Sequence, residues 1–119
     1  MSDWPYFSEV DKRMDGDFMD KLIALRQDLG FALPVNSSFR DPEHNKRVGG
    51  ADNSPHLLGR AVDIAVSGER AFKVVQAAPR FGFVGIGVKQ HGPHEKRFIH
   101  LDDCENVNGL PRPWVWTYA

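Results

Sequence analysis

The sequence contains a single cysteine, Cys104, among its 119 residues. No intramolecular disulfide can form, so the fold does not depend on an oxidising compartment, and we expect no functional role for this thiol. Positive charge is not in excess either, because 15 lysine and arginine residues face 16 aspartate and glutamate residues and form no cluster. A nucleic-acid partner therefore has no electrostatic support.

Long apolar runs are absent as well. No stretch approaches the ~20 apolar residues of a membrane span, so none is predicted. The N-terminal residues contain neither the basic region nor the apolar run of a signal peptide, and we expect a cytoplasmic location. The chain has no internal repeat or low-complexity linker, and its length suits a single domain over residues 1–119, which we expect to be monomeric.

Hydrophobic spacing predicts a helix near the N-terminus. From Phe18 to Leu29 the apolar residues fall at i, i+4, i+7 and i+11, which places them on one face. Asp17 is the expected N-cap and Gly30 the expected stop, so the helix is predicted over residues 17–29. Its expected role is support of the core.

Two further helical segments are predicted. Residues 41–46 form one turn, because an aspartate suited to capping precedes a proline suited to the first helical position. Ser67 is expected to cap a longer helix that runs through Ala78, with Phe72 and Val75 facing inward.

The β-prone segments are short and separated by turn residues. Strands are expected at residues 33–37, 61–66, 81–88 and 98–102. The glycines of the third segment, at 82, 85 and 87, indicate close backbone approach or a bulge rather than phosphate binding. Residues 103–119 are expected to be loop-like.

The segment that carries the chemistry lies in the middle of the chain. Within residues 61–66 the β-branched side chains alternate with Ala, Asp and Ala, so Asp63 stands alone on the face opposite the core. His56 lies seven residues earlier, after a turn-prone Asn-Ser-Pro and before a glycine that lets the backbone bend back. A neutral imidazole and a carboxylate that converge on one point suit a zinc ion. A third ligand is expected from His100, which shares a strand face with Asp102.

Two motifs resemble those of a known family. Residues 54–63 read Ser-Pro-His-x-x-Gly-x-Ala-x-Asp. This resembles the Ser-x-His-x-x-Gly-x-Ala-x-Asp motif of the zinc D-alanyl-D-alanine carboxypeptidase family, which also includes murein endopeptidases and phage endolysins. Residues 98–102, Phe-Ile-His-Leu-Asp, resemble the later motif that supplies the third ligand. The resemblance extends from about residue 7 to residue 114, and the joint spacing of its motifs is specific.

The resemblance implies a fold and a function. The fold is α+β, with a small antiparallel sheet that carries the zinc ligands His56, Asp63 and His100 and is flanked by two or three helices. The function implied is zinc-dependent hydrolysis of an amide bond in peptidoglycan stem peptides or cross-links. Ser54, which opens the first motif, is expected to contact the substrate. A phage or prophage endolysin, cytoplasmic until its release onto the cell wall, would fit the lack of a signal peptide.

Arg40 ends a Ser-x-x-Arg segment upstream of the metal motif. In the resembled family the arginine at this position is placed to bind a substrate carboxylate, and a guanidinium suits that task because it forms two parallel hydrogen bonds. The alternative is a surface arginine paired with Asp41 or Glu43, which would contribute little. Together with the metal motif, the substrate-binding role is favoured.

The general base is less well defined by the sequence. Asp102 follows His100 on the same strand face and is our prediction for the group that takes a proton from water. Many family members have an acidic base three residues before the last ligand, where this chain has Arg97. Glu95 and His94 are therefore alternatives as the base. Asp102 could instead orient a ligand histidine.

Several questions stay open at this point. An inactive zinc-binding module, similar to the Hedgehog signalling domain, and a phage structural component are the alternative functions. D-Ala-D-Ala carboxypeptidase, DD-endopeptidase and L-alanyl-D-glutamate endopeptidase activities all occur in the resembled family. Trp114 and Trp116 could serve packing or line a groove for a glycan or peptide. His44, His91 and His94 are expected at the surface.

Overall fold

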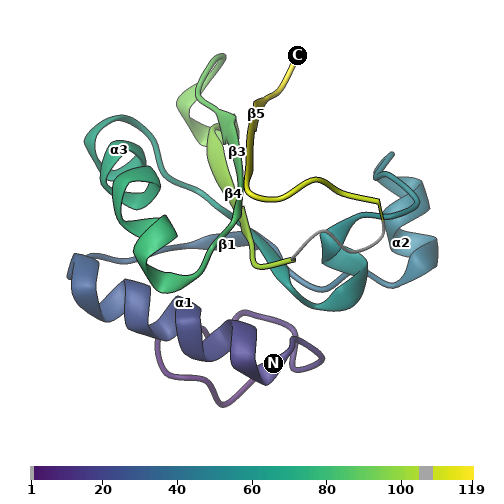
Figure 1. The fold of residues 1–119 in the computed structure, drawn as a ribbon, viewed down its shortest axis with the longest axis horizontal. Helices are drawn as coiled ribbons and strands as arrows, with labels where there is room; N and C mark the ends of the chain where they lie inside the picture. Colours follow the sequence, from purple (N-terminus) through teal and green to yellow (C-terminus); the bar gives the residue numbers. More distant parts are fainter. Residues whose placement is uncertain (1, 105–108) are drawn as a thin grey trace.

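The computed structural model describes residues 2–104 and 109–119. The described residues form an α+β fold with a five-stranded sheet in the order β1-β2-β4-β3-β5 (Figure 1). The strands are β1 (Val35–Ser37), β2 (Ala61–Ile64), β3 (Gly85–Lys89), β4 (Phe98–Asp102) and β5 (Trp114–Thr117). The α-helices are α1 (Gly16–Leu29), α2 (Pro42–Arg47) and α3 (Gly68–Ala77). Short 3-10 helices are η1 (Pro55–Leu58), η2 (Ala78–Phe81) and η3 (His94–Lys96).

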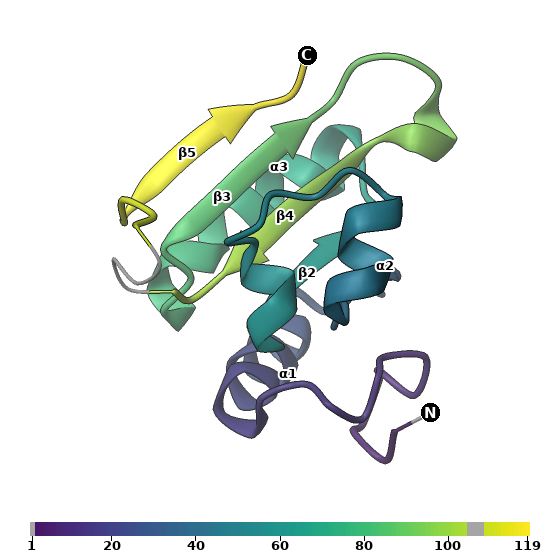
Figure 2. The ribbon, with the colours of Figure 1, turned by 90° about the vertical axis from the view of Figure 1, so that its right-hand side faces the viewer.

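The sheet separates a core side from an open side. Helices α1 and α3 lie on one side of it, whereas α2 and η1 lie on the other (Figures 1 and 2). The core is a continuous apolar cluster built from α1, α3 and the side chains of the central strands that point toward these helices. Its fully buried members include Phe18, Leu22, Leu25, Val62, Ile64, Val74, Ile99 and Leu101. The alternation predicted for β2 and β4 therefore places their apolar residues in the core.

The first helix begins slightly earlier than expected. Asp15, not Asp17, is the N-cap, and its carboxylate accepts a hydrogen bond of 3.0 Å from the backbone N–H of Phe18. Such a cap contributes about 1 kcal/mol. Gly30 ends the helix as predicted, in the left-handed conformation with a φ of 76°, which favours glycine.

Helix α3 differs from its prediction in the face that it buries. Ser67 occupies the N-cap position but makes no side-chain capping bond. Phe72 is 66% exposed, so its inward orientation was predicted wrongly. The buried face consists instead of Ala71, Val74 and Ala77, at i, i+3 and i+6. These smaller residues let the helix lie close to the sheet.

The C-terminal segment was wrongly predicted to be loop-like. Residues 105–108 lie outside the described residues, but Trp114–Thr117 form β5, which pairs with β3. This pair is parallel whereas the other pairs among the described strands are antiparallel, so the sheet is mostly rather than wholly antiparallel. A short edge strand that follows a proline-containing segment gives little periodic signal, because it has no second strand beyond it to bury its outer side.

Glycines on β3 explain how β5 fits against the sheet. A Cβ atom on Gly87 would lie 2.7 Å from atoms of both Trp116 and Tyr118, and one on Gly85 would overlap the carboxylate of Asp102. The close approach predicted from these glycines is therefore confirmed. Because Gly87 has no side chain on this face, the rings of Trp116 and Tyr118 extend over β3 to contact His100 and Phe98 on β4.

Candidate metal centre

One row of residues crosses all five strands on the open side of the sheet. Ser37, Asp63, His100, Gly87 and Trp116 are successive partners in the strand register. Directly paired residues point to the same face of a sheet, with Cβ atoms about 5 Å apart. The register thus brings two candidate ligands, from β2 and β4, next to each other.

The third ligand comes from the short helix before β2. Ser54 caps η1, because its hydroxyl accepts a hydrogen bond of 3.3 Å from the backbone N–H of His56. Gly59 then ends η1 in the left-handed conformation. A Cβ atom at this position would lie 3.0 Å from the backbone carbonyl oxygen of Arg13. A larger residue at this position would disturb the turn that returns the chain to β2.

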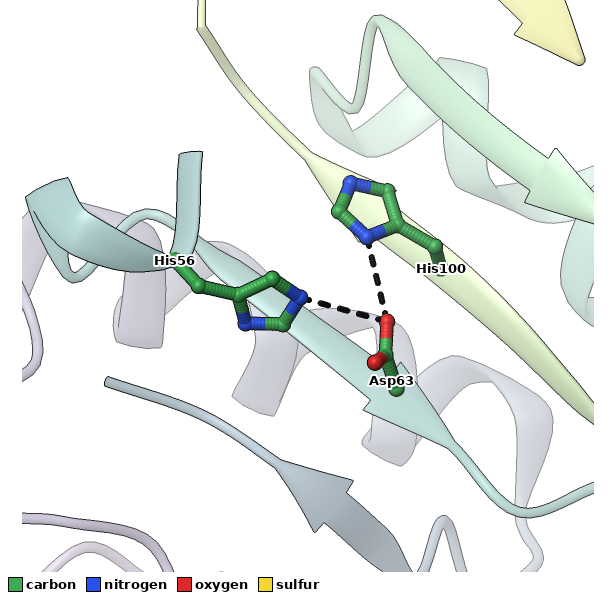
Figure 3. Close-up of side chains that lie close together, drawn as sticks. All are labelled: His56, Asp63 and His100. Carbon is green, nitrogen blue, oxygen red and sulfur yellow. Dashed lines mark hydrogen bonds and ion pairs between the residues drawn. The ribbon is translucent and has the colours of Figure 1, made fainter. Parts of the chain in front are cut away.

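The three predicted ligands meet at one buried point. Nε2 of His56 lies 3.3 Å from Oδ1 of Asp63, and Nδ1 of His100 lies 3.1 Å from the same oxygen. Figure 3 shows both rings turned toward this carboxylate, from η1 and from β4. All three residues are buried, and their ligand atoms lie within 4.8 Å of one another.

The other ring nitrogens fix how the two histidines present themselves. Nδ1–H of His56 donates to the carbonyl oxygen of Ser38 over 2.8 Å, and Nε2–H of His100 donates to Oδ2 of Asp102 over 2.7 Å. In the neutral rings, the nitrogens that face Asp63 are therefore lone-pair acceptors. Three buried acceptors that face one another need a cation between them.

This donor set fits zinc. Two imidazoles and one carboxylate, with each imidazole hydrogen-bonded through its second nitrogen, are typical of catalytic zinc sites. A tetrahedral ion at ~2.0–2.2 Å from its ligands sets those atoms about 3.4 Å apart. The two separations from Asp63 are 3.3 and 3.1 Å, close to that value.

Electrostatic interactions keep the carboxyl group of Asp63 ionised. Burial raises the pKa of Asp63, but hydrogen bonds to His100 and His56 and the charges of these rings lower it well below its usual value. For His100, burial lowers the pKa, whereas hydrogen bonds to Asp102 and Asp63 raise it, and the net direction is upward. The Asp63 carboxylate is thus an anion, the form that binds a cation.

A pocket of about 620 Å³ opens over the group. Among the described residues that line it, Asp63 is the only carboxylate. Its charged and aromatic lining comprises Arg40, His56, Asp63, Phe98, His100, Arg112, Trp114, Trp116 and Tyr118. The pocket can hold a ligand of several residues.

Arg40 is held in the pocket wall rather than on the surface. Its Nε donates to Ser37 Oγ over 3.3 Å and its Nη1 to Asn45 Oδ1 over 3.1 Å. Its Nη2 lies 3.7 Å from Oδ2 of Asp63. The alternative ion pairs with Asp41 or Glu43 are not formed among the described contacts, and the side chain is only 15% exposed. The guanidinium is therefore fixed in orientation beside the metal group.

Ser54 also lines the pocket, but its hydroxyl is already engaged in capping η1. Asp102 is fully buried and contacts His100 on the side of the ring that faces away from Asp63. Of the two roles that the sequence left open for Asp102, these contacts favour orientation of His100 over proton transfer. Glu95 and His94 are exposed and lie outside the pocket lining.

The sequence did not reveal one residue of this site. Arg112 forms a two-pronged ion pair with Asp102, at 2.9 and 2.8 Å. It lies ten residues further along the chain than Asp102, so no local spacing connects it to the motif. The one related feature in the sequence is Gly85, whose lack of a side chain leaves room for the Asp102 carboxylate to which Arg112 binds.

Comparison with known proteins supports this geometry. The family model described as Peptidase M15 matches residues 8–102, which include all three candidate ligands. The chain belongs to the peptidase M15 family. It is also similar to the zinc D-Ala-D-Ala carboxypeptidase of Streptomyces albus G, with 38% identity over 80 residues. That alignment covers 64% of this chain but only 31% of the relative's length.

Membership of the M15 family and the His56, Asp63 and His100 group together imply zinc as the cofactor. The chain is thus an M15 metallopeptidase with a candidate His/Asp/His site. None of the helices in residues 2–104 and 109–119 is long and apolar enough to cross a membrane.

Proposed function

We propose that this M15 peptidase hydrolyses an amide bond in peptidoglycan stem peptides or their cross-links. The observation that carries the proposal is the buried His56, Asp63 and His100 group at the base of a pocket that also contains a fixed arginine. The name of the Streptomyces albus G relative supports a D-Ala-D-Ala substrate, and D-Ala-D-Ala carboxypeptidase and endopeptidase activities both fit.

The three ligands would hold the metal and leave one position open toward the pocket. Bound zinc supplies a water whose pKa falls to about 7 and polarises a scissile carbonyl. The role of His56 and His100 is to present unprotonated nitrogens, which their bonds to Ser38 and Asp102 secure. Asp63 adds a negative charge that its surroundings keep ionised.

Arg40 would position the substrate. A stem peptide has free carboxylates, and a planar guanidinium binds a carboxylate through two parallel hydrogen bonds. Because Ser37 and Asn45 fix the Arg40 side chain, little conformational freedom would be lost on binding. The scissile carbonyl would then be held at a set distance from the metal group.

For proton transfer, Asp102 stays the group that the sequence predicts. Its contacts support the other role, because its oxygens are shared between His100 and Arg112. A second candidate function follows from the pocket lining, in which Asp63 is the only carboxylate of a described residue. An inactive zinc-binding module would need no further acid.

One experiment separates the two functions. Purified sacculi are digested with the protein, with and without a chelator, and the released fragments are weighed by mass spectrometry. We expect zinc-dependent products whose masses identify the bond that is cut, and no products from His100→Ala. Zinc bound at a ratio near one without any product would favour the inactive module. The endolysin role and the cytoplasmic location before release stay predictions, which lysis of host cells from within would test.

A further inference from the structure

Arg112 is bound to the metal group through one intermediary. Its Nε donates to Oδ1 of Asp102 over 2.9 Å and its Nη2 to Oδ2 over 2.8 Å. The same Oδ2 accepts the Nε2–H of His100 over 2.7 Å. The Arg112 side chain is 5% exposed and that of Asp102 is fully buried, so the pair is shielded from water. Charge-assisted, two-pronged bonds of this kind fix orientation as well as charge.

Three further neighbours pack around the Asp102 carboxylate and its partners. Its Oδ1 also accepts the backbone N–H of Cys104 over 3.3 Å. Gly85 lies so close on β3 that a side chain there would overlap the carboxylate. Trp116 lies across the top, with its ring centroid 5.0 Å from that of His100 and 5.2 Å from the Arg112 guanidinium carbon.

We propose that Arg112 is a positioning residue of the metal centre, acting through Asp102 to hold His100 with Nδ1 toward Asp63. Without Arg112, the Asp102 carboxylate would be a buried anion with one fewer partner and could rotate away from His100. The ring of His100 would then lose its fixed orientation. The family match ends at residue 102, so Arg112 belongs to a segment that the match does not cover.

The competing explanation is that the ion pair only attaches β5 to the sheet. The chain offers a control for it, because Arg60 makes the same two-pronged pair with the next residue, Asp103, at 2.9 and 2.7 Å. The Asp103 side chain is 1% exposed and also binds Lys21, at 2.8 Å. Arg60 is 30% exposed and also pairs with Asp15 over 3.1 Å. Neither Asp103 nor Asp15 has a described contact with a candidate ligand, so loss of Arg60 removes ion pairs without touching the metal group.

The test compares Arg112→Gln and Arg112→Lys with Arg60→Gln and Arg60→Lys. Folding of each variant is checked by circular dichroism and thermal unfolding. Zinc affinity is then measured by competition with a chromogenic chelator, and the visible absorption spectrum is recorded after replacement of zinc by cobalt. The spectrum reports ligand geometry, which a purely structural role would leave unchanged.

We expect Arg112→Gln to weaken zinc binding roughly 10- to 100-fold, as for other residues that orient a ligand histidine, and to alter the cobalt spectrum. Arg112→Lys should lie between it and the wild type, because lysine keeps the charge but not the fork. Both Arg60 variants should match the wild type in affinity and spectrum, even if they unfold at lower temperature. If Arg112→Gln fails to fold, Arg112→Lys is read by the same criteria.

Wild-type zinc affinity and an unchanged spectrum in folded Arg112 variants would overturn the proposal. So would an equal loss of affinity in the Arg60 variants, or a wild-type chain that binds no zinc. The inference rests on the metal part of the proposed function but not on its substrate. A protein whose zinc affinity depends on Arg112 but which leaves sacculi intact would refute the peptidoglycan activity alone.

Discussion

Asp63 and His100 are direct partners in the register of β2 and β4, and their facing atoms Oδ1 and Nδ1 lie 3.1 Å apart. A one-residue slip of either strand would turn one of the two ligands into the core. The apolar partners on the other face, such as Ile64 and Ile99, oppose that slip because they are fully buried. Core packing therefore holds the two ligands in register.

Removal of any one candidate ligand should abolish most zinc binding. His56→Ala, Asp63→Ala and His100→Ala each delete one of three convergent donors, and a tetrahedral site with two protein ligands binds far more weakly. Metal analysis after gel filtration at equal protein concentration measures the effect. Full zinc occupancy in His100→Ala would show that the assignment is wrong.

Asp102→Asn tests which of its two roles is correct. The change is nearly isosteric, but it removes the charge that Arg112 and His100 share. From the contacts we expect zinc affinity to fall roughly 10- to 100-fold. Turnover at saturating zinc separates the alternatives. A variant that keeps its zinc affinity but loses ~10²-fold or more in kcat would instead identify Asp102 as the general base.

Arg40→Lys should impair hydrolysis by roughly 1–3 kcal/mol in transition-state binding, because lysine cannot form two parallel bonds. The measurement is kcat/KM on a stem peptide with its carboxylate free and on the same peptide amidated. Amidation should harm the wild type more than the variant. Equal harm to both proteins would mean that Arg40 does not contact that carboxylate.

Gly87→Ala should destabilise the protein by about 1–3 kcal/mol, the usual range for overpacking. The added Cβ would lie 2.7 Å from the indole of Trp116, a rigid ring that cannot simply rotate away. The control is Gly16→Ala, because no atom lies within 4 Å of the corresponding Cβ. Thermal unfolding compares the two. A Gly87→Ala protein as stable as the control would indicate that β5 packs less closely than described.

Cys104 should be inert toward thiol reagents in the folded protein. Burial, followed by the charges of Asp102 and Asp103, raises the pKa of this thiol to about 11. Because folding raises the pKa, the unfolded chain loses the thiol proton first, and stability should decline as pH rises from about 9 toward 11. Labelling with iodoacetamide at pH 8 should require denaturant. Rapid labelling without denaturant would contradict the burial of Cys104.

The sequence predicted the ligands better than it predicted their support. The three ligands could be predicted because motif spacing and strand alternation are visible within short segments of the sequence around His56, Asp63 and His100. Arg112 lies in the bend just before the parallel edge strand β5, and its position depends on the register of β5 with β3. The sequence around Arg112 contains no pattern that predicts this register.

The helices show the same limit in a milder form. The period of α1 was clear, because Phe18, Leu22 and Leu25 all face the core. In α3 the largest apolar residue, Phe72, drew the prediction to the wrong face, since periodicity alone cannot show that the sheet admits only smaller side chains there. Which face of α3 is buried was therefore determined by tertiary packing, which the spacing of its apolar residues does not show.

The metal ligands and much of the pocket wall come from separate parts of the chain. The ligands lie within residues 56–100, whereas Trp114, Trp116 and Tyr118 reach the pocket from the edge strand. Trp116 lies against both His100 and Arg112, so it serves the metal group as well as the pocket wall. Trp114 is 55% exposed, and exposed residues are usually exchanged at little cost in stability. Substrate preference could thus be engineered at Trp114 while Trp116, Arg112 and the glycines of β3 are retained.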